Sequence, residues 1–349
     1  MHRSHTRRDS ADARLLDDVD LDIVAALHIA PRVPTATLAS ILDIPTSTAN
    51  RRIARMQDER LLRVVGRFAW DLIVSSNPYE LWITSSPGQS HAVTAALLGI
   101  PDVQAVIQTS GSTDIYANLY PLRGSDPQEL LVERIPAIPG IRAIDSRMIL
   151  ETAKVGQAWR FPRLPQRQQL ALEAEAAVEH QPPLASLAEL TELEFQTMRL
   201  LGENGRITAA EVGRRLGVSA STASRAIRTL LQTGAVTCRV EIEPSLIGFP
   251  LMAFVSLDVR PRDISRALET LAAHPAIRLL CTVTGEAPVS LAASFSGPAA
   301  LSEFLRQDLG ALPGVTSLSS ATALRTVRRY WVDRDGMRLG SATQDVLRR

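Results

Sequence analysis

The sequence repeats itself at a fixed step of 174 residues. The segment 32–51 returns as 206–225, and the segment 138–141 returns as 312–315. Because the repeat extends over about half of the chain, a single unit with two parts has been duplicated. The fold and function of this unit therefore decide those of the whole chain.

Composition limits the class of protein. With 349 residues the chain is long enough for about two to four domains with separate cores, and the repeat indicates four. The 38 Lys and Arg residues are balanced by 37 Asp and Glu residues, so an electrostatic partner has to be met by a local patch of the surface. Cys238 and Cys281 have no metal-ligand spacing around them, and we interpret them as buried or reduced thiols of a cytosolic protein.

No part of the sequence is typical of a membrane span or a targeting segment. An uncharged apolar stretch of about 18 residues is absent from the sequence. Met1 to Arg14 is polar and basic, without the apolar centre of a signal peptide. We interpret residues 1–15 as a basic tail that is disordered rather than bound to phosphates. The protein is expected to be cytoplasmic and to have no membrane partner.

Each copy opens with a pattern of three helices that is typical of a helix-turn-helix, followed by strand-like residues. A short β pair at 61–68 and 235–242 is expected to supply a wing. We assign the two winged helix-turn-helix domains to 16–68 and 187–247. The expected helices are 16–27, 35–42 and 46–59 in copy one and 190–201, 208–216 and 220–232 in copy two.

The turn before the third helix differs between the copies. Copy two offers Gly217 for a positive φ and Ser219 as an N-cap, and Gly234 follows its third helix. The residues at the same three places in copy one are Asp43, Pro45 and Arg60. Because these substitutions remove preferred turn and cap residues, the first helix-turn-helix is expected to sit differently or to contact DNA weakly.

A βαββαβ pattern follows each helix-turn-helix and is assigned to 78–157 and 250–331. The split βαβ order implies a four-stranded antiparallel sheet with both helices on one face, the ferredoxin-like arrangement. We interpret 158–186 as a linker with a short helix and 332–349 as a tail. The fold class expected is α+β, with two winged helix-turn-helix domains alternating with two ferredoxin-like domains. The expected strands are 79–84, 103–110, 114–120 and 141–152, and 251–259, 277–284, 289–295 and 315–327.

The third helices carry the residues expected to contact DNA. Small hydroxyl residues let the start of a helix enter the major groove and donate to phosphates, while Arg and Asn pair with base edges. An ordinary solvated helix surface is the alternative, but the same turn and helix phase in two copies favour DNA binding. The candidate DNA-binding residues are Ser47, Thr48, Asn50, Arg51, Arg52, Arg55, Ser219, Ser221, Thr222, Ser224, Arg225 and Arg228.

On these helices the chain resembles the leucine-responsive/asparagine-activator (Lrp/AsnC) family of transcription regulators. Leu16 and Asp17 with Asp20, and the Ser-Thr-Ala segments that precede the arginines, look like the N-terminal signature of the family; the run 211–236 fits it still better. The resemblance covers nearly all of the chain apart from its tails and linker. It implies a regulator with double-stranded DNA as partner, in a duplicated two-repeat form.

The second part of each copy resembles the amino-acid-responsive domain of that family, which often binds a small effector near the loop after its second strand. In copy one, Gly111 and Asp114 match the family's G-x-x-D pattern; the resemblance implies that backbone donors hold a carboxylate and that Asp114 receives an ammonium group. In copy two Pro288 replaces the Asp. A plain β-turn is the alternative for both loops. The candidate effector-binding residues are Ser110, Gly111, Ser112, Thr113 and Asp114.

Enzymatic motifs are missing from the sequence: no Gly-rich phosphate loop, no H-E-x-x-H and no Cys cluster occurs. We therefore expect no catalysis, no cofactor and no metal. Some proteins that look like this family are siroheme decarboxylases, but His91 and His274 do not follow the repeat, which disfavours this alternative. A dimerisation scaffold that has lost DNA contact is a third interpretation. The six histidines are His2, His5, His28, His91, His180 and His274.

The final expectation concerns how the two copies meet. Alternating apolar residues in 103–107 and 277–283 give each sheet a second apolar face, which is costly to leave in water. Pairing within one chain avoids the cost of joining separate chains, about 4–15 kcal/mol. We expect 79–155 to contact 251–327 of the same chain through their sheets, as an intrachain pseudo-dimer with both winged helices on one side. A further homo-oligomer, the operator and the identity of the effector are left open.

Overall fold

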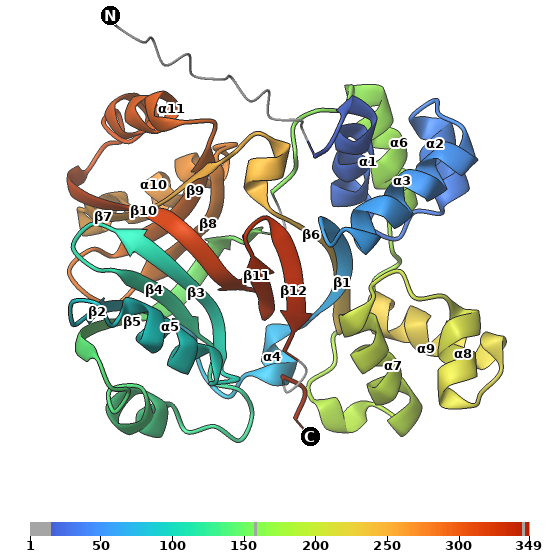
Figure 1. Ribbon diagram of the computed structural model, residues 1–349, viewed down its shortest axis with the longest axis horizontal. Coiled ribbons are helices and arrows are strands. Elements are labelled where there is room, and N and C mark those ends of the chain that lie inside the picture. Colours follow the sequence, from blue (N-terminus) through green and yellow to red (C-terminus); the bar gives the residue numbers. More distant parts are fainter. Residues whose placement is uncertain (1–14, 157–158, 344–345, 349) are drawn as a thin grey trace, which may run out of the picture.

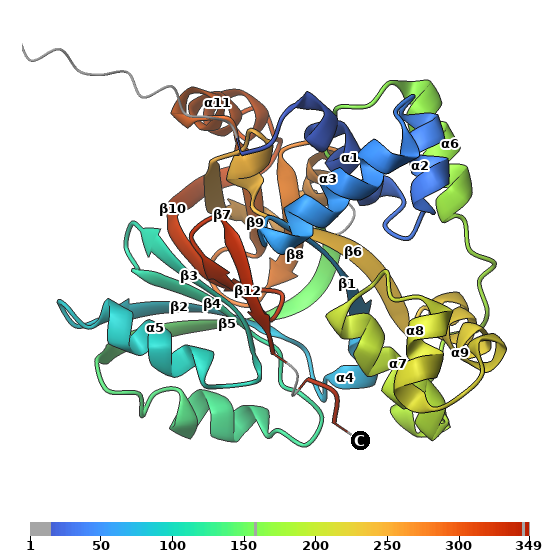
Figure 2. The ribbon, with the colours of Figure 1, turned by 45° about the vertical axis from the view of Figure 1, so that its right-hand side comes forward.

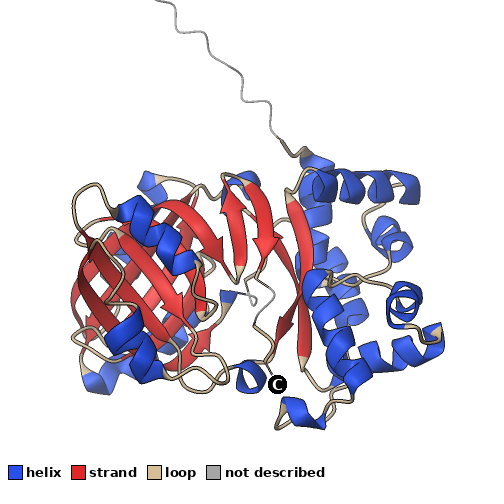
Figure 3. Cartoon of the chain, turned by 60° about the horizontal axis from the view of Figure 1, so that its bottom comes forward, coloured by secondary structure: helices blue, strands red, loops and turns tan. Residues whose placement is uncertain are grey.

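The computed structural model describes residues 15–156, 159–343 and 346–348 (Figure 1). The basic tail expected at 1–15 thus lies outside the described residues except for Leu15. A cluster of helices forms one end of the molecule, and the large sheet with its covering helices forms the other, with a two-stranded sheet between them (Figure 3). The fold is mixed α and β, as expected. No helix in the described part of the chain is long and apolar enough to cross a membrane.

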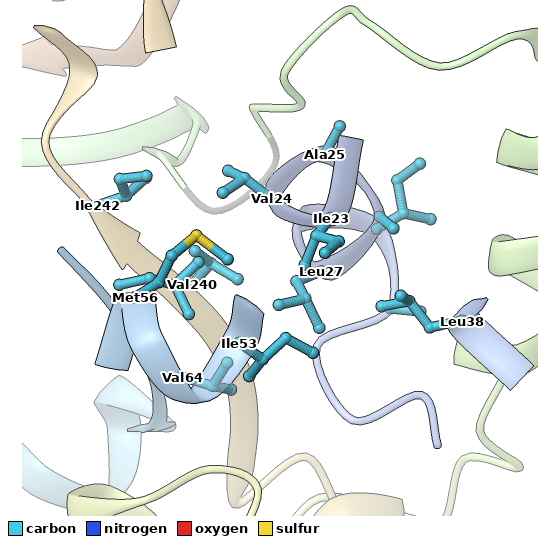
Figure 4. Close-up of a cluster of buried hydrophobic side chains, with 14 of the residues drawn as sticks. Ile23, Val24, Ala25, Leu27, Leu38, Ile53, Met56, Val64, Val240 and Ile242 are labelled. Carbon is cyan, nitrogen blue, oxygen red and sulfur yellow. The ribbon is translucent and has the colours of Figure 1, made fainter. Parts of the chain in front are cut away.

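The first helix-turn-helix is built around an apolar core that both copies share. Ile23 and Leu27 of α1 face Ile53 and Met56 of α3, and Val240 from the second copy joins them (Figure 4). Burying such side chains contributes about 1.5–3 kcal/mol each. The bounds are α1 (Asp18–Ile29), α2 (Thr35–Ile41) and α3 (Thr46–Asp58).

The second helix-turn-helix has the same order of helices and lies beside the first (Figure 2). Its core contains Met198, Ile227 and Leu230, together with Leu72 and Ile73 from the first copy. Each helical core therefore takes apolar residues from the other copy. The bounds are α7 (Glu192–Glu203), α8 (Ala209–Leu216) and α9 (Ala220–Gln232).

The backbone of the first turn follows that of the second despite the different residues. Asp43 has φ 55°, and its counterpart Gly217 has φ 69°. Arg60, with φ 60°, likewise adopts the left-handed backbone conformation of its counterpart Gly234. A residue with a Cβ costs roughly 1–2 kcal/mol in this left-handed region, so copy one keeps the geometry at an energetic cost. The expected difference in how the first module sits is not seen in these φ angles.

The two strands expected to form a wing pair with each other across the copies. They are β1 (Leu62–Phe68) and β6 (Val236–Ile242), and they form an antiparallel ribbon. The copies thus share one ribbon instead of each carrying a wing hairpin of its own. This ribbon lies between the helical end and the large sheet (Figure 1). A sequence pattern gives the strand but not its partner, because pairing over such a long separation leaves no local signal.

Eight strands of the large sheet close on themselves. Their order is β10-β3-β4-β2-β5-β8-β9-β7, and β7 pairs with β10 to complete the ring. Copy one contributes four adjacent strands in the order β5-β2-β4-β3. Copy two contributes the equivalent strands in the order β10-β7-β9-β8. The bounds are β2 (Tyr79–Ser85), β3 (Val103–Ser110), β4 (Ile115–Leu119), β5 (Ile141–Lys154), β7 (Leu251–Val259), β8 (Ile277–Val283), β9 (Val289–Phe295) and β10 (Val315–Arg329).

The ring buries the second apolar face of both sheets. Trp82, Ile107 and Tyr116 of copy one pack on Phe254 and Ala292 of copy two inside it. At its edges, β5 hydrogen-bonds to β8 and β3 hydrogen-bonds to β10. The expected contact between 79–155 and 251–327 of one chain is therefore present. Helices cover the outer faces: α5 (Ser90–Leu98), the π-helix Glu129–Arg134, α10 (Ile264–Ala272), α11 (Pro298–Glu303) and the π-helix Phe304–Asp308.

The expected tail differs from the structure, whereas the expected linker does contain a short helix. The expected tail at 332–349 contains a hairpin, β11 (Val332–Asp335) with β12 (Arg338–Ala342), that extends the sheet from β10. The linker contains α6 (Gln166–Ala176), whose Leu172 is buried in the first helical core. Short helices that the sequence pattern did not indicate are α4 (Trp70–Ile73), Leu187–Glu189, Pro244–Ile247 and Pro261–Asp263.

Candidate nucleic-acid interface and effector loop

The third helices α3 and α9 each bury one side and expose the other. In α9, Ile227 and Leu230 are buried, and the N-cap Ser219 accepts a hydrogen bond from the backbone N of Thr222 at 3.1 Å. In α3 the N-cap is Pro45, which has no side-chain cap. The candidate residues that are exposed are Ser47, Asn50, Arg51, Ser219, Ser221, Ser224, Arg225 and Arg228, while Thr48, Arg52, Arg55 and Thr222 are half-buried.

Two of the candidate arginines of α3 are engaged by acidic residues near the start of α1. Arg52 Nη1 lies 2.6 Å from Asp17 Oδ2 and 3.1 Å from Asp20 Oδ1. Arg55 Nη2 lies 2.6 Å from the other oxygen of Asp20, whose side chain is 1% exposed. A hydrogen bond from the backbone of Asp20, followed by the bond from Arg52, lowers the pKa of Asp17. These arginines hold α3 against α1, which leaves Arg51 as the exposed arginine among the three candidates.

The arginines of α9 have no such engagement. Within the described residues, no hydrogen bond or ion pair involves the side chains of Arg225 and Arg228. Arg225 is the repeat equivalent of Arg51, since they lie 174 positions apart. The guanidinium groups of Arg225 and Arg228 lie on one exposed side of the helix and have a fixed donor geometry. Such groups can donate hydrogen bonds to phosphates and to the acceptor atoms of guanine.

Arginines on α8 add positive charge beside α9, and the sequence reasoning missed them. Arg214 and Arg215 are exposed and both donate to Glu211, at distances of 2.7 Å to Oε1. Their hydrogen bonds lower the pKa of Glu211 to about 2. The pair of adjacent basic residues in the last turn of α8 was the sequence signal that pointed to them.

A reciprocal contact joins the two helix-turn-helix modules. Arg32 donates to the backbone oxygen of Gly205, and Arg206 Nη1 donates to the oxygen of Pro31 at 2.8 Å. Arg32 and Arg206 are repeat equivalents, and so are Pro31 and Gly205. A contact in which each residue meets the equivalent of its partner is what a two-fold interface produces.

The candidate effector loop lies between β3 and β4, where copy one meets β10 of copy two. Asp114 Oδ1 accepts a hydrogen bond from the backbone N of Ser85 at 2.8 Å, and its Oδ2 accepts one from the Ser85 hydroxyl. Ser110 Oγ lies 2.7 Å from Thr322 Oγ1 of β10. Gly111 has φ 123°, a value that favours glycine. The loop is therefore a hydrogen-bonded turn at the junction of the copies, with Asp114 anchored to β2.

Comparisons with known proteins agree with this geometry. Residues 16–57 match the AsnC-type helix-turn-helix domain, and residues 252–331 match the Lrp/AsnC ligand binding domain. The chain carries Lrp/AsnC family domains. Residues 188–241 of this Lrp/AsnC-type chain also match the MarR family.

The chain is similar to regulators of about half its length. It is 27% identical over 150 residues to an uncharacterized HTH-type transcriptional regulator of Pyrococcus horikoshii, covering 43% of this chain and 94% of that protein. It is 26% identical over 144 residues to the leucine-responsive regulatory protein of Rhizobium meliloti, covering 40% of this chain and 92% of that protein. One such relative thus corresponds in length to one repeat.

A solved structure resembles the Lrp/AsnC-type chain over most of its length. The siroheme decarboxylase NirDL matches with a TM-score of 0.57 and 11% identity, covering 89% of this chain and 92% of that chain. At this identity the likeness concerns the fold alone. Across the described residues, no group of three or more His, Cys, Asp or Glu side chains is placed to hold a metal ion.

Proposed function

We propose that this Lrp/AsnC-type chain is a sequence-specific transcription regulator that binds double-stranded DNA through α3 and α9. Both helices expose arginine and small hydroxyl residues, the set that reads base edges and phosphates. The observation that carries the proposal is the match of 16–57 to the AsnC-type helix-turn-helix, together with the exposed Arg51 and Arg225 at equivalent places of the two copies.

We further propose that one chain does the work of a dimer of single-repeat regulators. The reciprocal bonds of Arg32 and Arg206, the shared β1–β6 ribbon and the closed ring of strands support two-fold pairing inside the chain. In this proposal each ring half is a ferredoxin-like regulatory domain. Both helix-turn-helix modules lie at the same end of the molecule (Figure 2), as binding of two half-sites on one DNA requires.

Effector binding belongs to the same proposal. The loop from Ser110 to Asp114 would hold the carboxylate of a small amino-acid-like ligand on its backbone N–H groups. Asp114 keeps unused acceptor capacity beside its two bonds from Ser85, so it can also receive an ammonium group. Because the loop contacts β10, a ligand there would act on the junction between the copies.

The test of DNA binding has two steps. Fragments of the source genome that bind the purified chain are selected and sequenced, and one of them is labelled. Fluorescence anisotropy then compares the wild type with the double variant Arg51→Ala and Arg225→Ala. We expect a common sequence among the fragments and weaker binding by the variant. Recovery of fragments without a shared sequence, with equal binding by both proteins, would count against the proposal.

A second candidate, decarboxylation of a tetrapyrrole, draws on the fold likeness to NirDL. Of the histidines, His91 is exposed on α5 and His274 lies at the end of α10 beside Asp308, whereas His28 borders a cavity together with arginines. We favour the regulator because two segments match regulator domains and the likeness to NirDL concerns the fold alone. Mixing the chain with an iron tetrapyrrole and recording the visible spectrum separates the two, since only the second candidate requires a shift of the absorption bands.

A further inference from the structure

The two repeat-related junctions between helices and ring differ in how they are filled. At one junction, between α1, β6, β8 and β10, lies a cavity of about 750 Å³. At its counterpart beside α7 and β1, the space is only about 80 Å³. There the side chain of Phe68 packs closely on Gly202. A Cβ on that glycine would lie 2.6 Å from the aromatic ring of Phe68. The open junction has His28 at the place equivalent to Gly202.

Arginines from three strands line the open junction. Arg239 of β6, Arg278 of β8 and Arg329 of β10 border this cavity and also a second one of about 240 Å³ that continues into the ring. Their repeat equivalents are Val65, Gln104 and Val155, so these three cations have no charged counterparts in copy one. We call the space that these three arginines border the arginine cavity.

The arginine cavity holds more positive charge than its own carboxylates neutralise. Glu241 pairs with Arg239 at 2.6 Å and with Arg334 at 2.7 Å, while Glu243 lies 3.6 Å from Arg329 and also pairs with Arg334. These two carboxylates thus serve three arginines. Arg278 has no hydrogen bond or ion pair among the described residues, and its guanidinium carbon lies 3.9 Å from the centre of the Trp159 ring.

Charge without a partner is costly in such a place. Burial, together with the positive charges of Arg329 and Arg239, lowers the pKa of Arg278 to about 9. Nε atoms of Arg239, Arg278 and Arg329 are buried without an acceptor among the described residues. An unpaired buried cation such as Arg278 destabilises the fold, so its presence among buried guanidinium groups indicates a site for an anion.

We propose that the arginine cavity binds a small organic anion that carries at least two carboxylate or phosphate groups. Arg32 and Arg160 also border the cavity, so with Arg334 behind the lining six arginines face three glutamates, Glu175, Glu241 and Glu243, and a ligand with two or more negative charges offsets the excess. The guanidinium of Arg278 offers a bidentate fork to one group, and Arg239 and Arg329 offer donors to the next. The cavity is separate from the loop of Ser110 to Asp114.

The position of the cavity gives the anion a regulatory role, an extension that rests on the proposed function. His28 and Ile29 belong to the end of α1, whereas Arg278 and Arg329 belong to the ring. An anion between them ties the first helix-turn-helix to the ring and restricts its orientation. DNA affinity then depends on the anion through one of the two modules, because the other junction is filled.

Two probes test binding by the full chain. Citrate supplies carboxylates and pyrophosphate supplies phosphates, and each is titrated calorimetrically in a chloride buffer of fixed ionic strength. We expect one of them to bind with one anion per chain and to raise the melting temperature. Arg278→Gln is expected to weaken this binding at least tenfold, whereas Arg306→Gln, an exposed arginine of the same copy, leaves it unchanged.

The outcomes separate this inference from the proposed function. Binding of neither probe, or equal binding by the wild type and Arg278→Gln, overturns the arginine cavity as a site. Should Arg278→Gln lose its cooperative unfolding, Arg278→Lys keeps the charge without the fork, and equal affinity in that variant overturns the site too. DNA affinity in the absence of either anion is expected to be equal in the wild type and Arg278→Gln. If neither protein binds the DNA, that result contradicts the proposed function instead of the arginine cavity.

Discussion

Val65 and Arg239 lie opposite each other at the centre of the β1–β6 ribbon, and they are the same position of the two repeats. The register repeats on the ring, where Ile149 opposes Val283 and their equivalents Ala323 and Thr109 also oppose each other. In these strand pairings each residue thus meets the equivalent of its partner. The pairing inside one chain has the form of an isologous interface.

The first prediction ranks the two recognition helices through a matched pair of variants. Arg225→Ala is expected to weaken operator binding more than Arg51→Ala, because α9 has the Ser219 cap and a second unengaged arginine, Arg228. A lost base contact costs about 1–3 kcal/mol, and a lost phosphate contact lowers the salt slope by about 1. Anisotropy titrations at two salt concentrations measure both quantities. Equal or reversed losses would reject the ranking.

The second prediction concerns the ion pairs that hold α3 on α1. Asp20→Ala removes the buried carboxylate shared by Arg52 and Arg55 and is expected to lower the free energy of unfolding by about 2–4 kcal/mol, since both arginines lose their partner and α3 loses its tie to α1. Both arginines are partly exposed, so the loss falls toward the lower end. Asp58→Ala on the exposed side of α3 is the control. Urea unfolding that gives equal values for the two variants would show that Asp20 has no such role.

The third prediction is a pH dependence. Burial, with the charges of Arg278, Arg160 and Arg239, lowers the pKa of His28 to about 3. In the unfolded chain a histidine has a pKa of about 6.5, so between these values the unfolded state binds a proton that the folded state does not. Stability therefore falls as the pH drops below about 6.5, by at most about 1.4 kcal/mol per pH unit from this group.

The variant His28→Gln isolates this contribution from that of the carboxylates. Its free energy of unfolding is expected to decline less steeply than that of the wild type between pH 7 and pH 5. Urea unfolding at several pH values gives the two slopes, which are compared irrespective of the absolute stabilities. Parallel slopes would mean that His28 accepts its proton normally in the folded protein.

The fourth prediction addresses the effector loop. If an amino acid raises the melting temperature of the wild type, Asp114→Ala is expected to abolish this rise. The variant also loses two hydrogen bonds from Ser85, so its own melting temperature falls. Ser85→Ala removes the hydroxyl bond but keeps the carboxylate, and it is expected to retain the response. An amino acid that stabilises Asp114→Ala as much as the wild type would exclude the loop as its site.

Sequence reasoning located the elements better than their partners. The helical periodicity around Ile53 and Ile227 predicted α3 and α9, and the apolar alternation around Val103 predicted β3, because these patterns are local. Pairing of β1 with β6 joins residues about 174 positions apart and leaves no local pattern. The hairpin of β11 and β12 did have a signal that was overlooked: Gly336, with φ 59°, in a two-residue turn.

The candidate DNA-binding residues remain a prediction, to which the structure adds their surroundings. Arg52 and Arg55 fit a DNA-contacting pattern in the sequence, and their pairing with Asp20 becomes visible only in the folded chain. The arginine cavity was missed because Arg239, Arg278 and Arg329 lie on strands far apart in the sequence. The repeat gives no signal for them either, since their equivalents are not charged.

Footprinting on a selected operator tests most directly the claim that one chain acts as a DNA-binding pseudo-dimer. Hydroxyl-radical cleavage is recorded with the wild type, Arg51→Ala and Arg225→Ala, after ultracentrifugation has fixed the number of chains per DNA. We predict one chain per operator and two protected patches, one weakened selectively by Arg51→Ala and the other by Arg225→Ala. A single protected patch that responds to only one of the variants, or protection that requires two chains, would contradict the account.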